Sequence, residues 1–169
     1  MKKFLMGFVA AMVVLPVGCL ACFAVGFSPI QADLKPSALE TALLRSAVRA
    51  SVRHNAAGVP NPPAASKDDI VAGGKLYVLG CQGCHGNLGG VYQEDYDLYP
   101  APPQLPHVGT QYSEPELYWI LKHGVRMTGM SACGPFYSEK ELWSLAAFLR
   151  RIDKLPPEML ERIRPKKTG

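Results

Sequence analysis

The chain has 169 residues, of which 48% are hydrophobic and 19% are charged, enough to bury one modest core. Its formal charge is +4, and six basic against two acidic side chains place that whole excess in residues 1–65, so residues 66–169 are neutral. A nucleic-acid-binding role is therefore not supported, because the part that can fold around a site has no basic stripe. Fifteen prolines and sixteen glycines predict short helices joined by much irregular chain.

The N-terminal segment has the length of a membrane span. An uncharged run extends from Phe4 through Phe27, and two lysines precede it. These lysines predict that the short end stays in the cytoplasm and that the rest of the chain lies outside. The alternative is a signal peptide cleaved after Ala32, but the apolar core of a signal is shorter, about 7 to 15 residues. We therefore predict a retained anchor over residues 1–30.

Residues 31–65 predict an amphipathic helix and a linker. Ser37 with Glu40 three residues later forms a capping box. The apolar residues at helical spacing are Leu39, Leu43, Ala47 and Val48, with three arginines elsewhere on the wheel. Its position after the anchor favours a helix on the membrane surface or against a partner, and a solvated helix that covers the domain is an equal alternative. The prolines of "NAAGVPNPPAAS" predict a semi-rigid spacer up to a domain boundary near Ser66.

The next helix leads to the motif that carries the chemistry. Ser66 and the acidic residues behind it predict the start of a helix through "DIVAGGKLYVLG". Gly73 and Gly74 each lower helix propensity by about 1 kcal/mol relative to alanine, so we expect a close helix crossing at this pair.

The sequence "CQGCH" follows directly. Cys81 and Cys84 can each add to one vinyl group of a porphyrin, and His85 reaches the iron from one side. A zinc site would need a second ligand pair at similar spacing, and the other histidines and cysteine of this region are scattered singly. A thioredoxin-like pair would need a surrounding βαβ pattern, which the sequence lacks. The motif therefore predicts one covalent haem c per chain.

A second axial ligand is expected from "KHGVRMTGMSACGPFYS". A thioether ligand needs irregular chain, and Met130 lies between a preceding glycine and a following Gly-Pro pair. Met127 is nearer the end of the previous helix, which a glycine terminates. We predict Met130 as the ligand, with Met127, His107 and His123 as the alternatives. Cys133 is predicted to be a buried, inert thiol, with a thiolate ligand as the alternative.

Two further helices are predicted in this region. Capping boxes begin at Ser113 and at Ser138. The last helix has an apolar stripe beside Trp143 and Ala147. Through this stripe it can pack across the glycine pair of the helix that precedes the Cys-x-x-Cys-His motif. No strand signal occurs, so the predicted fold class is all-α. Residues 156–169 predict an exposed basic tail.

Residues 66–155 resemble the small class I (monohaem) cytochromes c, and more narrowly the membrane-tethered bacterial ones. The resemblance rests on "AGGKLYVLGCQGCHG", "YPAPPQL", "GVRMTGM" and "SEKELWSLAAFLRRI". It implies a small cytochrome c fold, with three main helices around one haem c. The anchor and the amphipathic helix would precede this fold. His85 would be the proximal ligand and Met130 the distal one.

The resemblance also implies a particular helix crossing. The first and last helices would cross with Gly74 and Tyr77 against Trp143 and the residues around Ala147, and the prolines of residues 100–106 would line the loop below the haem. Ser131 departs from the pattern, since such proteins usually carry a proline after the ligand methionine.

The predicted function is electron transfer, because an iron held on both faces by protein has no open position for a substrate. We expect no enzyme activity of its own, but a carrier or a subunit of a larger oxidoreductase. It would take electrons from a quinol-oxidising or dehydrogenase complex of the respiratory chain and pass them to an oxidase or a soluble cytochrome. The expected location is the cytoplasmic (inner) membrane, single-pass, with the haem domain on the periplasmic side. The alternatives are a haem-based sensor with a displaceable methionine and an assembly module whose cysteines hold no haem.

Overall fold

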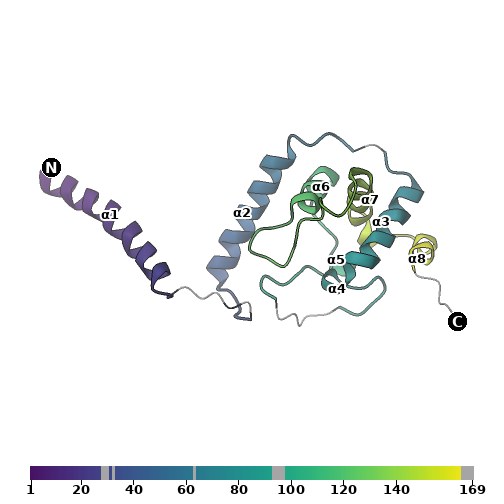
Figure 1. Ribbon diagram of the computed structural model, residues 1–169, viewed down its shortest axis with the longest axis horizontal. Helices are drawn as coiled ribbons and strands as arrows, with labels where there is room; N and C mark the ends of the chain where they lie inside the picture. The colour runs from purple at the N-terminus through teal and green to yellow at the C-terminus, as the bar shows by residue number, and fades with distance from the viewer. Residues whose placement is uncertain (28–30, 32, 63, 93–97, 165–169) are drawn as a thin grey trace. The chain divides into compact units, whose positions relative to one another are not determined.

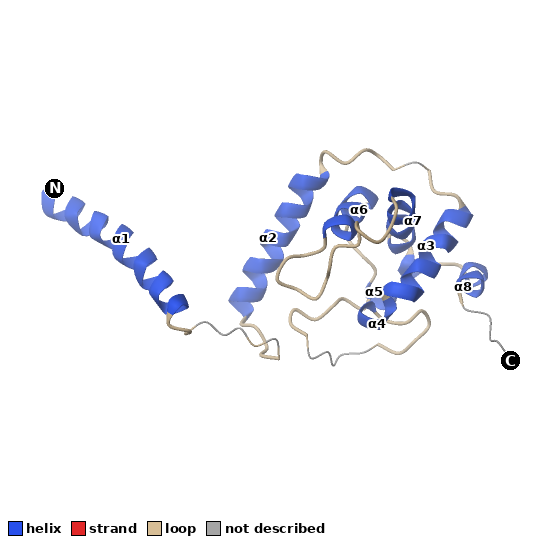
Figure 2. Ribbon diagram, in the orientation of Figure 1, coloured by secondary structure: helices blue, strands red, loops and turns tan. Residues whose placement is uncertain are grey.

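The structure is a computed structural model that describes residues 1–27, 31, 33–62, 64–92 and 98–164. These residues form helices and loops and contain no strand (Figures 1 and 2). The helices are α1 (Lys2–Ala24), α2 (Ala38–Ala56), α3 (Lys67–Gly80), α4 (Gln82–His85), α5 (Leu105–Val108), α6 (Glu114–His123), α7 (Glu139–Leu149), the short 3-10 helix η1 (Ile152–Lys154) and α8 (Pro157–Ile163). The predicted all-α fold class is confirmed.

The chain divides into two compact units, Met1–Leu34 and Lys35–Gly169. The first contains α1, whose 23 residues have a mean hydropathy of 2.4 in their most apolar window. At 1.5 Å per residue this helix is about 35 Å long, slightly more than the ~30 Å hydrocarbon core of a bilayer. Its length and composition suit a membrane span, and an N-terminal signal sequence has the same properties.

The core of the second unit lies between the three main helices, α3, α6 and α7. Their starts are fixed locally: Ser66 and Ser138 each form a capping box with the acidic residue three positions later. Most of α7 is buried, including Leu145 and Phe148, which are fully buried. The sequence of α7 is amphipathic, yet most of this helix is buried because it packs against both α3 and α6.

The glycine pair of α3 permits the close crossing expected of it, but with a different register. A methyl group at Gly73 would overlap the backbone carbonyl of Ser144 in α7. A methyl group at Gly74 would lie 2.5 Å from the Ile163 side chain of α8, so this glycine mainly faces another helix. The predicted crossing is met at Phe148, beside Ala147, because a ring carbon of Phe148 would lie 2.9 Å from the same methyl group. It is not met at Trp143, which is not among the nearest neighbours of Gly74. Successive residues of a helix turn by about 100° and meet different neighbours.

Aromatic contacts show the same shift in register. Trp143 stacks on Tyr118 of α6, with 4.3 Å between ring centroids. The ring of Tyr77 instead packs against Phe148, with centroids 5.4 Å apart. Trp143 thus joins α7 to α6, and Phe148 joins α7 to α3.

The helix α2 belongs to the same unit as the haem-motif helices. Val52 and Ala56 are buried, and α2 packs on α6. Leu39 and Leu43, on the predicted apolar stripe, are exposed. The face of α2 that packs on α6 therefore carries Val52 and Ala56, and the leucines lie on a different face of the helix.

The C-terminal segment differs from the exposed tail predicted for residues 156–169. It forms α8, in which Met159 and Ile163 are buried against the core. The guanidinium of Arg162 also lies 2.7 Å from a carboxylate oxygen of Asp68 at the start of α3. Apolar residues at helical spacing account for the difference; residues 165–169 lie outside the described part of the chain.

Candidate haem site

The two cysteines and the histidine lie on one turn of helix immediately after α3. Cys81 ends α3, and its carbonyl accepts hydrogen bonds from the N–H groups of Cys84 at 3.2 Å and His85 at 2.9 Å. Both thiols are free; Cys81 is half-buried and Cys84 is exposed. The local backbone thus presents two thiols and an imidazole from five consecutive residues, as covalent haem attachment requires.

The imidazole of His85 is held by the proline-rich loop. Its Nδ1 lies 3.0 Å from the carbonyl oxygen of Pro103. With Nδ1–H donating to this carbonyl, Nε2 keeps its lone pair for a metal, the usual orientation of a ligating histidine. Burial lowers the pKa of His85, and the hydrogen bond to Pro103 partly opposes that change. The net lowering of the pKa favours the neutral imidazole, the form that can ligate a metal.

Two buried polar side chains fix the backbone behind the motif. The hydroxyl of Tyr77 lies 2.6 Å from the carbonyl oxygen of Gly86 and 3.0 Å from that of His85. Gln104 is 2% exposed, and its amide nitrogen donates to the Cys84 carbonyl at 3.1 Å. The other amide atom of Gln104, Oε1, is buried and has no hydrogen-bond partner within the described residues.

Neither role was predicted from the sequence. The one clue in the sequence to a close contact at this point is Gly86, the glycine directly after the motif. In the structure it has a φ of 93° and leaves room for the Gln104 side chain.

The loop after α6 is fixed by its own hydrogen bonds. α6 ends at Gly124, which has a φ of 67°. The N–H of Val125 donates to the Met130 carbonyl at 2.9 Å. The hydroxyl of Thr128 donates to the Val125 carbonyl at 2.7 Å and accepts from the N–H of Met130 at 3.1 Å. The backbone on both sides of the Met130 thioether is thereby held in place.

The environment of the two methionines differs. Met130 is partly buried and packs against the core cluster, whereas Met127 is 93% exposed and has a φ of 58°. The alternative histidines are exposed: His123 packs on Trp119, and His107 meets Tyr92 edge to face. Among these four candidates, the thioether of Met130 alone is packed against the core.

Cys133 lies in the neighbourhood of the motif. Burial raises its pKa, and its backbone N–H donates to the Leu121 carbonyl at 2.8 Å. Burial, together with the nearby thiols of Cys133 and Cys84, raises the pKa of Cys81 to about 11. A protonated thiol at neutral pH agrees with the inert cysteine that we expected at position 133.

The donor set fits a covalent haem. Two free thiols lie on one turn, the neighbouring imidazole is oriented by a carbonyl, and a half-buried thioether comes from a separate loop. No cluster of three His, Cys, Asp or Glu side chains suited to a metal ion occurs among the residues that the structure describes. The zinc alternative therefore lacks its second ligand pair there.

Fold and site together define a small helical domain with a Cys-x-x-Cys-His motif whose donors fit a covalent haem. The family model described as cytochrome C oxidase, cbb3-type, subunit III matches residues 68–149, from the first turn of α3 to the end of α7. No curated protein and no solved structure matches the chain significantly. Residues 68–149 are a domain of the monohaem cytochrome c family, which implies covalently bound haem c and haem-based electron transfer.

Proposed function

We propose that this protein is a membrane-tethered electron carrier whose haem iron is ligated by His85 and Met130. The observation that supports it best is that both candidate ligands are held by hydrogen bonds in separate segments of the domain. The Pro103 carbonyl orients the imidazole of His85, and the Val125 and Thr128 hydrogen bonds hold the Met130 loop. The haem supplies a reversible one-electron change at its iron.

The side chains of this chain would set how that change occurs. Cys81 and Cys84 attach the porphyrin, and Tyr77 and Gln104 keep the attachment backbone rigid. With His85 and Met130 both bound, the iron would have no position open to a substrate. A thioether ligand and an apolar surrounding both favour the ferrous form, because they disfavour the additional positive charge of the ferric state.

The redox partners and location proposed here follow from α1 and from the family. α1 would hold the protein in the cytoplasmic membrane, with the haem domain on the periplasmic side. Electrons would come from a quinol-oxidising or dehydrogenase complex and pass to an oxidase or a soluble cytochrome. The description of the matched family names an oxidase subunit. This supports an oxidase as the electron acceptor or as the complex to which this chain belongs.

Optical spectra of the purified full-length protein test the proposal. We expect the sharp α-band of a low-spin c-type haem in the reduced state and a sulfur-to-iron charge-transfer band in the far red of the oxidised state. Carbon monoxide should leave the reduced spectrum nearly unchanged, since neither face of the iron is open. A high-spin spectrum that changes with carbon monoxide would support the haem sensor instead. A protein without covalent haem would contradict both.

Two matched substitutions test the thioether ligand. Met130→Ala should abolish the charge-transfer band, because the iron loses its sulfur ligand. Met127→Ala should keep the band, because the exposed Met127 side chain does not pack against the core. The opposite pattern would assign the ligand to Met127.

A further inference from the structure

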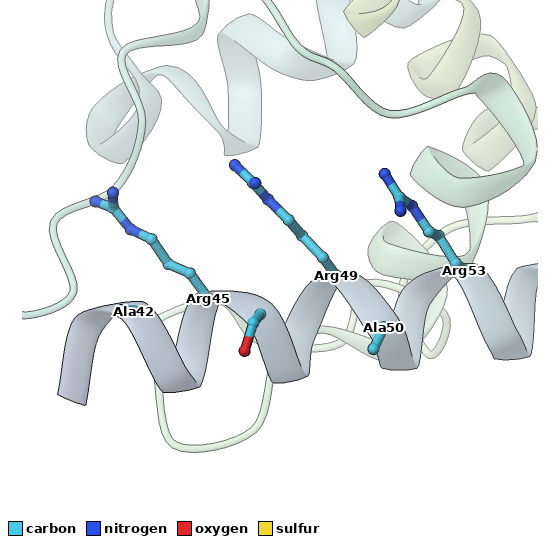
Figure 3. A pocket seen from close by; sticks show the side chains of 6 residues that line it. Ala42, Arg45, Arg49, Ala50 and Arg53 are labelled. Carbon is cyan, nitrogen blue, oxygen red and sulfur yellow. The ribbon is translucent and has the colours of Figure 1, made fainter. Parts of the chain in front are cut away.

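α2 carries a row of arginines on the side that meets the domain. Arg45, Arg49 and Arg53 are spaced four residues apart and so lie within an arc of about 80° on the helix. The buried residues Val52 and Ala56 lie in or beside the same arc, and they pack α2 against the domain. Figure 3 shows the three arginine side chains extending from one side of α2. The arginine row thus continues the packed face toward the N-terminal end of the helix.

The packing of α2 on α6 locates this row along the domain. Ala56 lines one hollow together with Ser113 and Glu116 at the start of α6, so the two helices run antiparallel. Arg45 precedes Ala56 by about 16 Å of helix, and α6 is about 15 Å long at 1.5 Å per residue. The arginine row therefore follows α6 to the end at which the Met130 loop begins, and α2 lies alongside both in Figure 1.

The three guanidinium groups carry charge that the described residues do not neutralise. None of the three has an ion pair or a hydrogen bond there. In contrast, Arg151 after α7 is paired with Glu114 at the start of α6, and Lys122 near the end of α6 is paired with Glu139. The arginines line a surface hollow of about 440 Å³. Residues 66–169 are neutral overall, so α2 contributes the positive charge of the haem-binding unit.

We propose that Arg45, Arg49 and Arg53 bind the two propionate carboxylates of the haem. Guanidinium groups bind carboxylates through paired hydrogen bonds, and the row lies beside the loop from which the sixth ligand would come. The inference rests on the proposed covalent haem. The row lies outside residues 68–149, so it is a feature that the matched family does not define.

Such binding has two measurable consequences. Positive charge beside the carboxylates keeps them ionised to lower pH, because it favours the charged form. Positive charge near the iron also disfavours the ferric state, so the arginines raise the reduction potential.

The test is a potentiometric titration of the full-length, haem-loaded protein in neutral detergent over a range of pH. In the triple variant Arg45→Gln, Arg49→Gln, Arg53→Gln the midpoint potential should fall at neutral pH. The pH at which the potential becomes pH-dependent should rise, because the propionates lose the charge that lowers their pKa. The corresponding lysine variant should retain most of both properties. Each single glutamine variant should change both in the same direction, which keeps the test valid if the triple variant binds haem poorly.

The matched control is Arg150→Gln, which removes an exposed arginine after α7 that has no ion pair among the described residues. Its potential and pH profile should stay as in the wild type. Equal potentials and equal pH profiles in the wild type and in the haem-loaded arginine variants would overturn the inference alone. A wild-type protein without covalent haem would overturn the proposed function.

Discussion

At the scale of single residues, the haem motif depends on polar groups that lie outside it. The Tyr77 hydroxyl and the Gln104 amide hold three successive backbone carbonyls, those of residues 84, 85 and 86. Both side chains are almost completely buried; the hydrogen bond to the Gly86 carbonyl is buried, and those to the carbonyls of residues 84 and 85 are partly buried. Removal of either group leaves a buried polar atom without a partner, which costs more free energy than an exposed hydrogen bond contributes.

Tyr77→Phe tests this support. The ring and its contact with Phe148 remain, and only the hydroxyl is lost. We expect the free energy of unfolding to fall by about 1–3 kcal/mol, because buried carbonyls lose their donor. Urea unfolding followed by circular dichroism measures this change in the free energy of unfolding. Tyr118→Phe is the control, since its hydroxyl contacts the side chains of Glu139 and Lys122, which are 78% and 40% exposed and so remain accessible to water. Equal losses in the two variants would contradict the account.

These residues also show why sequence reasoning found only part of the site. Cys81, Cys84 and His85 were predicted because their chemistry requires neighbours within five residues. Gln104 acts on a backbone carbonyl 20 positions away, and no pattern in the sequence announces such a contact. The preference for Met130 over Met127 rested on glycines in the loop, and the different burial of the two side chains supports it.

At the scale of helices, α3 and α7 cross closely at Gly73, where an added methyl group would overlap the Ser144 backbone. A glycine in the middle of a helix costs about 1 kcal/mol relative to alanine. Here that cost is offset because the absence of a side chain lets the Ser144 backbone lie directly against α3. The packing of α7 on α3 in turn positions Tyr77, and through it the haem motif.

Gly73→Ala should therefore destabilise the domain in spite of the better helix propensity of alanine. The added methyl group meets a backbone carbonyl that cannot rotate away, so we expect a loss of about 1–3 kcal/mol or more in the free energy of unfolding. Thermal unfolding followed by circular dichroism measures it. Gly58→Ala is the control, because a methyl group there meets nothing within 4 Å. A neutral or stabilising Gly73→Ala would show that the two helices separate without cost.

The start of α7 gives a prediction about pH. The Ser138 hydroxyl and backbone N–H donate to the Glu141 carboxylate at 2.7 and 2.8 Å, and both lower the pKa of Glu141. Because the pKa is lower in the folded protein than in the unfolded chain, the stabilisation is present above the unfolded value, about 4.3, and is lost as pH falls through the folded value. Ser138→Ala should lower the unfolding temperature at neutral pH, and the difference from the wild type should shrink in acid. A difference that does not change with pH would contradict this.

The starts of the helices could be predicted because a capping box involves residues only three positions apart. The buried faces of the helices were harder to predict. Ser66, Ser113 and Ser138 all precede helices as expected. The face of α2 was predicted from its leucines, but its partner α6 covers Val52 and Ala56 instead. A hydrophobic pattern indicates which face is apolar, whereas the neighbour available in the fold decides which face is buried.

At the scale of the whole molecule, the chain combines a cytochrome c domain with an apolar N-terminal helix that belongs to a separate unit. Residues Lys35–Gly169 form one compact unit, and α1 belongs to the other. None of the most apolar window of α1 is buried within the structure, and this stretch has no charged side chain after its first two residues. Such a helix is stable in water only at a large cost in exposed apolar surface, so a bilayer is the environment that suits it.

Membrane fractionation tests whether α1 retains the haem domain at the membrane. The full-length protein should remain with the membranes after washing with high salt and with alkaline carbonate, because burial in hydrocarbon is insensitive to both. Replacement of residues 1–27 by an unrelated, cleavable export signal should release a soluble periplasmic protein with an unchanged haem spectrum, since the Cys-x-x-Cys-His motif and the Met130 loop lie wholly in the second unit. Release of the full-length protein by carbonate, or an intact mass that lacks the first 27 residues, would show that α1 is a cleaved signal. The same spectrum in both proteins would then still place electron transfer in the second unit alone.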